Sequence, residues 1–161
     1  MILLGIDPGL HYSGFGIIKK EKQKTFLLDY GYLTLKPKLS IPSRLELFYD
    51  FFCEKIKKNN VSQLALETPF LGKNAQNFLK LGYLRGILYL LSSQHNIIVH
   101  EFSPRQVKRS ITGYGGANKE QVARVILRLF PKLNQPKRDD VTDALAVTLC
   151  GLWKSKNSYF L

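Results

Sequence analysis

Short apolar runs in the first third of the chain are separated by polar and turn residues. Residues 2–6 form one such run, which Asp-Pro-Gly ends, and residues 13–20 and 25–35 flank the charged sequence EKQK. Runs of this length between turn residues are typical of β-strands. We therefore predict three strands here, connected as an antiparallel meander.

From Pro42 onward, many apolar residues recur three or four positions apart, which is the spacing of one face of a helix. Two short apolar runs interrupt this pattern and predict further strands. The elements predicted in order are a helix from Pro42 to the polar sequence KKNN, a strand at 63–67, a helix at 75–91, a strand at 97–100, and helices at 104–110, 119–130 and 139–153.

This order of elements predicts an α/β fold. Strands that alternate with helices favour parallel crossover connections, whereas the opening meander favours antiparallel pairing. We expect a mixed five-stranded sheet, with the first three strands antiparallel and the remainder parallel, flanked by helices. The 161 residues contain no internal repeat, low-complexity tract or linker, so we expect a single domain over residues 1–161.

The balance of charge indicates the kind of partner. The chain has 24 Lys and Arg against 12 Asp and Glu, a formal net charge of +12, while its 45% of hydrophobic residues is typical of a globular core. This excess predicts a polyanionic partner, nucleic acid first and an anionic membrane surface second.

Cysteine usage and the lack of targeting signals indicate a cytoplasmic protein. The N-terminal MILLGIDPG has no basic segment before its apolar residues, and no apolar run reaches the roughly 18 residues of a membrane span. Cys53 and Cys150 each lie in an apolar run, which indicates buried reduced thiols rather than a disulfide framework. No membrane partner is expected.

Four acidic residues stand where the local sequence would not demand a charge. Asp7 and Glu67 each end an apolar strand, and Asp140 and Asp143 share one face at the start of the apolar last helix. Each also fits a structural role as a turn residue, a strand-end charge or a helix cap. Together they are the oxygen ligands that a pair of divalent cations needs for phosphoryl displacement. Nine Lys and Arg against one Glu lie between residues 102 and 138, so we favour a metal-dependent nuclease or polynucleotidyl transferase.

Five motifs in register carry a family resemblance. GIDPG with the following GFGII, then LALETPF, KNA, RQVK and the late DDVTDALA together resemble RuvC-type Holliday junction resolvases of the ribonuclease-H-like superfamily. The resemblance implies an RNase-H-like fold, a homodimer, and symmetric paired nicks in a four-way DNA junction during recombination and DNA repair. It also implies Mg²⁺ as cofactor, two ions per active site, with Mn²⁺ able to substitute, and coupling to a RuvA–RuvB branch-migration complex.

The family's four catalytic, metal-binding carboxylates fall on Asp7, Glu67, Asp140 and Asp143. We expect Asp7 to bridge both ions, one of which turns a water into the nucleophile while the other stabilises the departing 3′ oxygen. Asp139 departs from the family pattern, and we expect it to cap the helix or to lie near the ligands as an additional charge.

Further positions match the family's DNA contacts. Phe70 resembles the aromatic residue that stacks on unpaired bases at the junction centre, with Leu71 beside it, although a core position would also explain a phenylalanine. Lys108 and Lys119 match basic positions near the scissile phosphate. Lys73 and Arg105 are candidates of the same kind, and a solvated surface charge is the alternative for each of these cations.

The helix at 75–91 resembles the family's dimer helix. It carries Tyr83 and Tyr89 among leucines, and Gly82 and Gly86 would let another helix approach closely. An internal core helix explains the same pattern.

Two alternative functions stay open on the sequence alone. One is a related RNase-H-like nuclease that acts on RNA, and the other is a non-catalytic module that binds branched DNA. Junction and RNA substrates compared side by side separate the first, and Mg²⁺-dependent products that Asp7→Asn abolishes exclude the second. An actin-like or sugar-kinase-like phosphotransferase needs two such domains to enclose ATP, which this chain is too short to supply.

Overall fold

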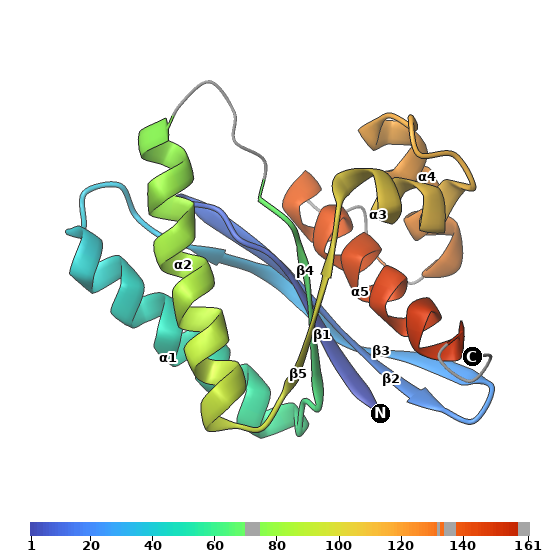
Figure 1. Cartoon of the computed structure of the whole chain (residues 1–161), viewed down its shortest axis with the longest axis horizontal. Helices are drawn as coiled ribbons and strands as arrows, with labels where there is room; N and C mark the ends of the chain where they lie inside the picture. Colours follow the sequence, from blue (N-terminus) through green and yellow to red (C-terminus); the bar gives the residue numbers. More distant parts are fainter. Residues whose placement is uncertain (70–74, 132, 134–137, 158–161) are drawn as a thin grey trace.

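A five-stranded sheet in the order β3-β2-β1-β4-β5 runs through the middle of the protein (Figure 1). The structure is a computed structural model that describes residues 1–69, 75–131, 133 and 138–157. The elements are β1 (Ile2–Asp7), β2 (Tyr12–Glu21), β3 (Lys24–Thr34), α1 (Ile41–Asn59), β4 (Gln63–Glu67), α2 (Ala75–Gln94), β5 (Ile98–Phe102), α3 (Pro104–Thr112), α4 (Lys119–Leu129) and α5 (Asp139–Asn157).

The pairing of the strands confirms the predicted mixed sheet. β1 pairs antiparallel with β2, and β2 antiparallel with β3, whereas β4 pairs parallel with both β1 and β5. Because β1 and β4 run side by side in the same direction, with Ile6 opposite Leu66, they bring Asp7 and Glu67 to the same edge of the sheet. This edge is where sites form in open α/β sheets.

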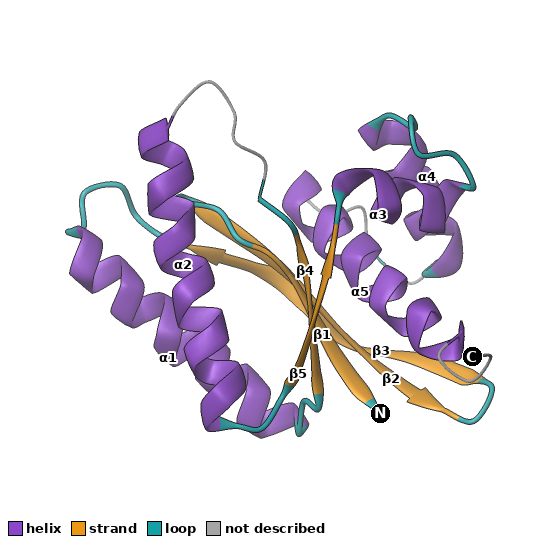
Figure 2. Cartoon of the chain, viewed as in Figure 1, coloured by secondary structure: helices purple, strands orange, loops and turns teal. Residues whose placement is uncertain are grey.

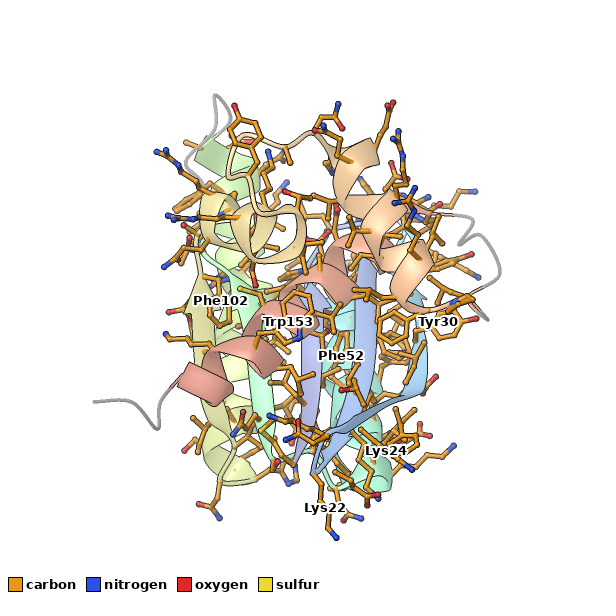
Figure 3. All side chains as sticks on the ribbon, turned by 90° about the vertical axis from the view of Figure 1, so that its right-hand side faces the viewer. Lys22, Lys24, Tyr30, Phe52, Phe102 and Trp153 are labelled. Atoms are coloured by element: carbon orange, nitrogen blue, oxygen red, sulfur yellow. The ribbon has the colours of Figure 1, made fainter. Side chains whose placement is uncertain are left out.

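Helices cover the two faces of the sheet in separate layers (Figure 2). One face packs against α1 and α2 in a core that includes Phe48, Phe52 and Leu88. The other packs against α5, with α3 and α4 lying on α5 in turn. Figure 3 looks onto this second face, where Phe102 and Trp153 belong to the core around α5.

Glycines on β1 and β2 let α5 lie close to the sheet. A Cβ on Gly5 would lie 2.0 Å from the Thr148 hydroxyl, and one on Gly14 would lie 1.9 Å from the Asp140 carbonyl oxygen. Gly14 is the register partner of Asp7, so this close approach seats the start of α5 beside the end of β1. Gly14 thus allows a close approach between two backbones, as glycine in a strand often does.

The fifth strand starts one residue later and ends two residues later than the periodicity predicts. Ile97 donates its amide to the Ser92 carbonyl at the exit of α2, and pairing with β4 continues as far as Phe102 opposite Glu67. Periodicity did not extend the strand to Glu101 because a charged residue gives no apolar signal, whereas parallel pairing needs only its backbone.

Cys53 and Cys150 are both buried free thiols, as predicted. Among the described helices, none combines the length and the apolar character needed to cross a membrane.

Candidate active site

The predicted acidic residues gather around one cavity at the carboxyl ends of β1 and β4. This cavity has a volume of about 310 Å³, and Asp7, Glu67 and Asp143 line it. Asp140 lies beside it, since its backbone packs on Gly14, the register partner of Asp7. Two parallel strands and the first turn of α5 therefore bring together carboxylates from three segments that are far apart in the sequence.

Burial and mutual repulsion perturb the carboxylates on the strands. The pKa of Asp7 rises to about 7, chiefly because the group is buried, and further because Asp143, Asp140 and Glu67 are nearby negative charges. The pKa of Glu67 rises for the same reasons, burial first and Asp143 second, although Lys108 and Lys119 oppose the rise. Ionising Asp7 and Glu67 together is therefore costly even with these two lysines nearby.

Basic side chains pair with the two carboxylates on α5. Lys119 donates to Asp143 over 2.9 Å, and the hydrogen bond and charge of Asp143 raise the pKa of Lys119. Arg138 donates to Asp140 over 2.7 Å, and its guanidinium lies 3.4 Å from the centre of the Tyr12 ring. Each of these acids thus already carries a positive partner.

The chemistry of this cluster fits a hard divalent cation. Four carboxylates supply only oxygen donors, which Mg²⁺ prefers, and the raised pKa values of Asp7 and Glu67 mark a site that added positive charge would stabilise. Across the described ranges, no three His, Cys, Asp or Glu side chains already converge as a metal site. Lys119 is paired with Asp143, and Arg138 is paired with Asp140. The two aspartate side chains would therefore have to rotate away from these partners before they could bind the same ion.

Helix caps position the two lysines at the cavity. α3 begins with a capping box between Ser103 and Gln106, and α4 begins with one between Asn118 and Gln121. The first helix projects Lys108 and the second begins with Lys119, and both lysines line the cavity with the carboxylates. These two predicted DNA contacts therefore lie beside the candidate catalytic residues.

Two other sequence candidates, Arg105 and Asp139, do not line the acidic cavity. Arg105 lines a separate hollow with Arg109 and Tyr114, so the structure does not bring it into the acidic cavity. Asp139 is exposed at the first position of α5, and its carbonyl accepts a hydrogen bond from Thr142. Three of the predicted contacts, Phe70, Leu71 and Lys73, lie outside the described residues.

The roles of two arginines beside the site are not predicted from the sequence. Arg138 is one of nine cations in a basic segment of the sequence, and no neighbouring residue in the sequence indicates its contact with Tyr12 from β2. Arg85 on α2 is buried and donates to the carbonyl oxygen of Glu67. Its position within the apolar run LRGILYLL was a usable signal, because an unpaired charge is rarely buried.

The outer surface of α2 carries large apolar side chains. Leu79, Tyr83 and Leu90 are exposed there, and a Cβ on Gly82 or Gly86 would meet nothing within 4 Å. α2 is thus a core helix on one side, and it exposes apolar side chains on the other.

Comparison with known proteins agrees with this geometry. Residues 3–151 match the family model described as crossover junction endodeoxyribonuclease RuvC. The protein of that name from Chloroherpeton thalassium is 41% identical over 155 residues, 96% of this chain and 83% of the relative. The one from Halothermothrix orenii is 38% identical over 150 residues, 93% of this chain and 91% of the relative.

Solved structures show the same fold. RuvC from Thermus thermophilus superposes with a TM-score of 0.87 at 24% identity, covering 98% of this chain and 97% of that one. The same protein in complex with a Holliday junction substrate gives a TM-score of 0.90, with 98% and 96% covered. The match to the family model over nearly the whole chain, together with relatives about 40% identical, establishes that this chain belongs to the RuvC family of crossover junction endodeoxyribonucleases.

Proposed function

We propose that this protein is a Mg²⁺-dependent endodeoxyribonuclease that resolves four-way DNA junctions by symmetric paired nicks, in recombination and repair. The observation that carries the proposal is the cavity in which Asp7, Glu67 and Asp143 meet Lys108 and Lys119. Such a site can attract a phosphodiester through its lysines and place acidic oxygens against the same phosphate. Family membership supports the choice of a DNA junction as substrate.

In phosphodiester hydrolysis, the carboxylates of the chain would bind the cations and its lysines would bind the phosphate. Asp7, Glu67, Asp140 and Asp143 would hold two divalent cations, which when bound lower the pKa of a water and stabilise the leaving 3′ oxygen. Lys108 and Lys119 would bind the scissile phosphate by charge. On our proposal, Lys119 exchanges its ion pair with Asp143 for one with the scissile phosphate when cations and substrate bind. The same lysine would thus neutralise Asp143 in the free protein and the phosphate during cleavage.

Affinity for the junction would come from the basic surface as a whole. With a net charge of +12, the protein should release counterions from several phosphates on binding, and its affinity should fall steeply with salt. Arg105, Phe70, Leu71 and Lys73 are further candidates for contacts with the junction. The carboxylates then decide cleavage rather than binding.

Paired nicks need two active sites, and we propose a homodimer that forms through α2. The exposed Leu79, Tyr83 and Leu90, with the open Gly82 and Gly86 between them, support this choice. Engagement of a RuvA–RuvB complex belongs to the same proposal. So does a cytoplasmic location, which two free thiols favour.

The test is cleavage of a synthetic mobile four-way junction with Mg²⁺ and with EDTA. Wild-type protein should give symmetric, ligatable nicks only with Mg²⁺. Asp7→Asn should abolish them and keep junction binding, while Asp139→Asn serves as the matched control that keeps both. Strong Mg²⁺-dependent cleavage by Asp7→Asn would overturn the assignment, and preference for an RNA junction would indicate an RNA-processing relative.

A further inference from the structure

A buried arginine joins α2 to the end of the catalytic strand β4. Arg85 is only 6% exposed, and its Nη1 donates to the main-chain carbonyl oxygen of Glu67 over 2.7 Å. Its Nη2 donates to the Tyr89 hydroxyl over 2.9 Å and to the Glu101 carboxylate. The Tyr89 hydroxyl in turn donates to Glu101 over 2.6 Å. One guanidinium therefore connects α2, β4 and β5.

The Glu67 contact extends the hydrogen bonding of Arg85 beyond its ion pair with β5. Glu101, whose side chain is 40% exposed, already neutralises Arg85. That pair leaves other N–H donors of the buried guanidinium to be satisfied, and each of them needs an acceptor. The second arm of the guanidinium reaches the last residue of β4, whose side chain lines the acidic cavity.

The backbone at this point is held from two directions. The Thr68 amide donates to the Phe102 carbonyl on β5 over 2.8 Å, while Arg85 holds the preceding carbonyl from α2. These bonds fix the peptide plane after Glu67 and thereby the direction in which its side chain leaves the chain. Displacements of about 1 Å in an active site can cost about 100-fold in rate.

We propose that Arg85 is a positioning residue for Glu67, and that through it the seating of α2 sets the geometry of the acidic site. The inference rests on the proposed nuclease function and on the dimer surface of α2. The exposed side of this helix carries Leu79 and Tyr83, while its buried side carries Arg85. A shift of α2 when a second copy docks would therefore act on the Glu67 carbonyl directly.

Arg85→Lys tests the proposal in the full-length protein. Lysine keeps the positive charge beside Glu101 but lacks the planar fork that reaches two acceptors at once. We expect the single-turnover rate at saturating junction to fall 10- to 100-fold. The junction dissociation constant, measured in EDTA, should stay within 2-fold. We also expect Mn²⁺ added without DNA to raise the melting temperature of Arg85→Lys by less than it raises that of the wild type.

Lys55→Met is the matched control. Lys55 forms a partly buried ion pair with Asp29 over 2.6 Å, between α1 and β3 and outside the acidic cavity. Loss of this pair should lower the melting temperature and leave the cleavage rate within 2-fold. A merely structural Arg85 would behave in the same way, and that result would overturn the proposal.

A second variant covers the case in which Arg85→Lys does not fold. Tyr89→Phe keeps both charges and removes only the hydroxyl that braces Arg85 and Glu101, so a 3- to 10-fold loss of rate is expected. An unchanged rate in Tyr89→Phe would then overturn the proposal. If wild-type protein fails to cut junctions, the proposed function itself is wrong, which is a different outcome from normal cleavage by the Arg85 variant.

Discussion

Asp7→Asn should make the metal-free protein more stable, although it removes the central candidate for catalysis. The cause is the environment of the Asp7 carboxyl, whose pKa rises to about 7 from its ordinary value of 3.8 because of burial and three neighbouring carboxylates. Asparagine has nearly the same shape and cannot ionise. The variant therefore escapes the cost of burying a negative charge among others.

The size of this effect follows from the two pKa values. A difference of about three pH units at about 1.36 kcal/mol each is worth about 4 kcal/mol. Below pH 3.8 both folded and unfolded chains hold the proton, and the full stability is present. As pH rises to 7, the unfolded chain releases the proton while the folded chain keeps it, so wild-type stability falls through this window.

Urea unfolding in EDTA measures the prediction. The difference in unfolding free energy between Asp7→Asn and wild type should widen by about 2–3 kcal/mol between pH 5 and pH 8, since about two pH units of the window lie there. Mg²⁺ added at pH 8 should stabilise the wild type and leave the variant unchanged. Asp139→Asn, exposed at the start of α5, should show a flat difference.

A difference between Asp7→Asn and wild type that does not change with pH would refute this reasoning. It would mean that the pKa of Asp7 in the folded protein is close to its ordinary value. The argument that mutual repulsion of the carboxylates favours cation binding at this site would then fail. The measurement needs no DNA, so it is independent of whether the junction is the substrate.

Three further predictions concern the surroundings of the site. Asp140→Asn should lower single-turnover junction cleavage at least about 100-fold, because it removes one of the oxygen ligands that would place the cations against the phosphate, while Asp139→Asn stays within 3-fold. The reverse result would move the metal ligand by one position. Gly14→Ala should destabilise the protein by about 1–3 kcal/mol in urea unfolding, because its Cβ would lie 1.9 Å from the Asp140 carbonyl oxygen, and wild-type stability would contradict that contact. Lys119→Met should change the free energy of unfolding by less than about 1 kcal/mol, since the lysine side chain is 72% exposed. The same variant should cleave the junction more than 10-fold more slowly than the wild type. Equal cleavage rates would exclude Lys119 from phosphate binding.

Local patterns in the sequence were enough to predict the elements and to single out acidic residues that the fold brings around one cavity. Apolar runs ended by turn residues mark β1 and β4, and the acids at their ends are visible because a charge interrupts each apolar pattern. The alternation of elements also predicts the mixed sheet, because parallel strands need crossover helices between them. Each of these inferences depends on spacing within one segment or on chain connectivity.

Only the tertiary structure decides which distant side chains meet at the site. Three contacts join segments that are separate in the sequence. The Asp140 backbone packs against Gly14, the Arg138 guanidinium lies over the Tyr12 ring, and Arg85 donates to the Glu67 carbonyl. The same is true of Arg105, which stays a candidate for DNA contact and lines a hollow separate from the acidic cavity. Periodicity specifies which face of an element is buried, but the partner on that face depends on strand register and helix packing. For this protein, the sequence determined the elements and the acids, and the packing of α2 and α5 on the sheet decided how those acids are held.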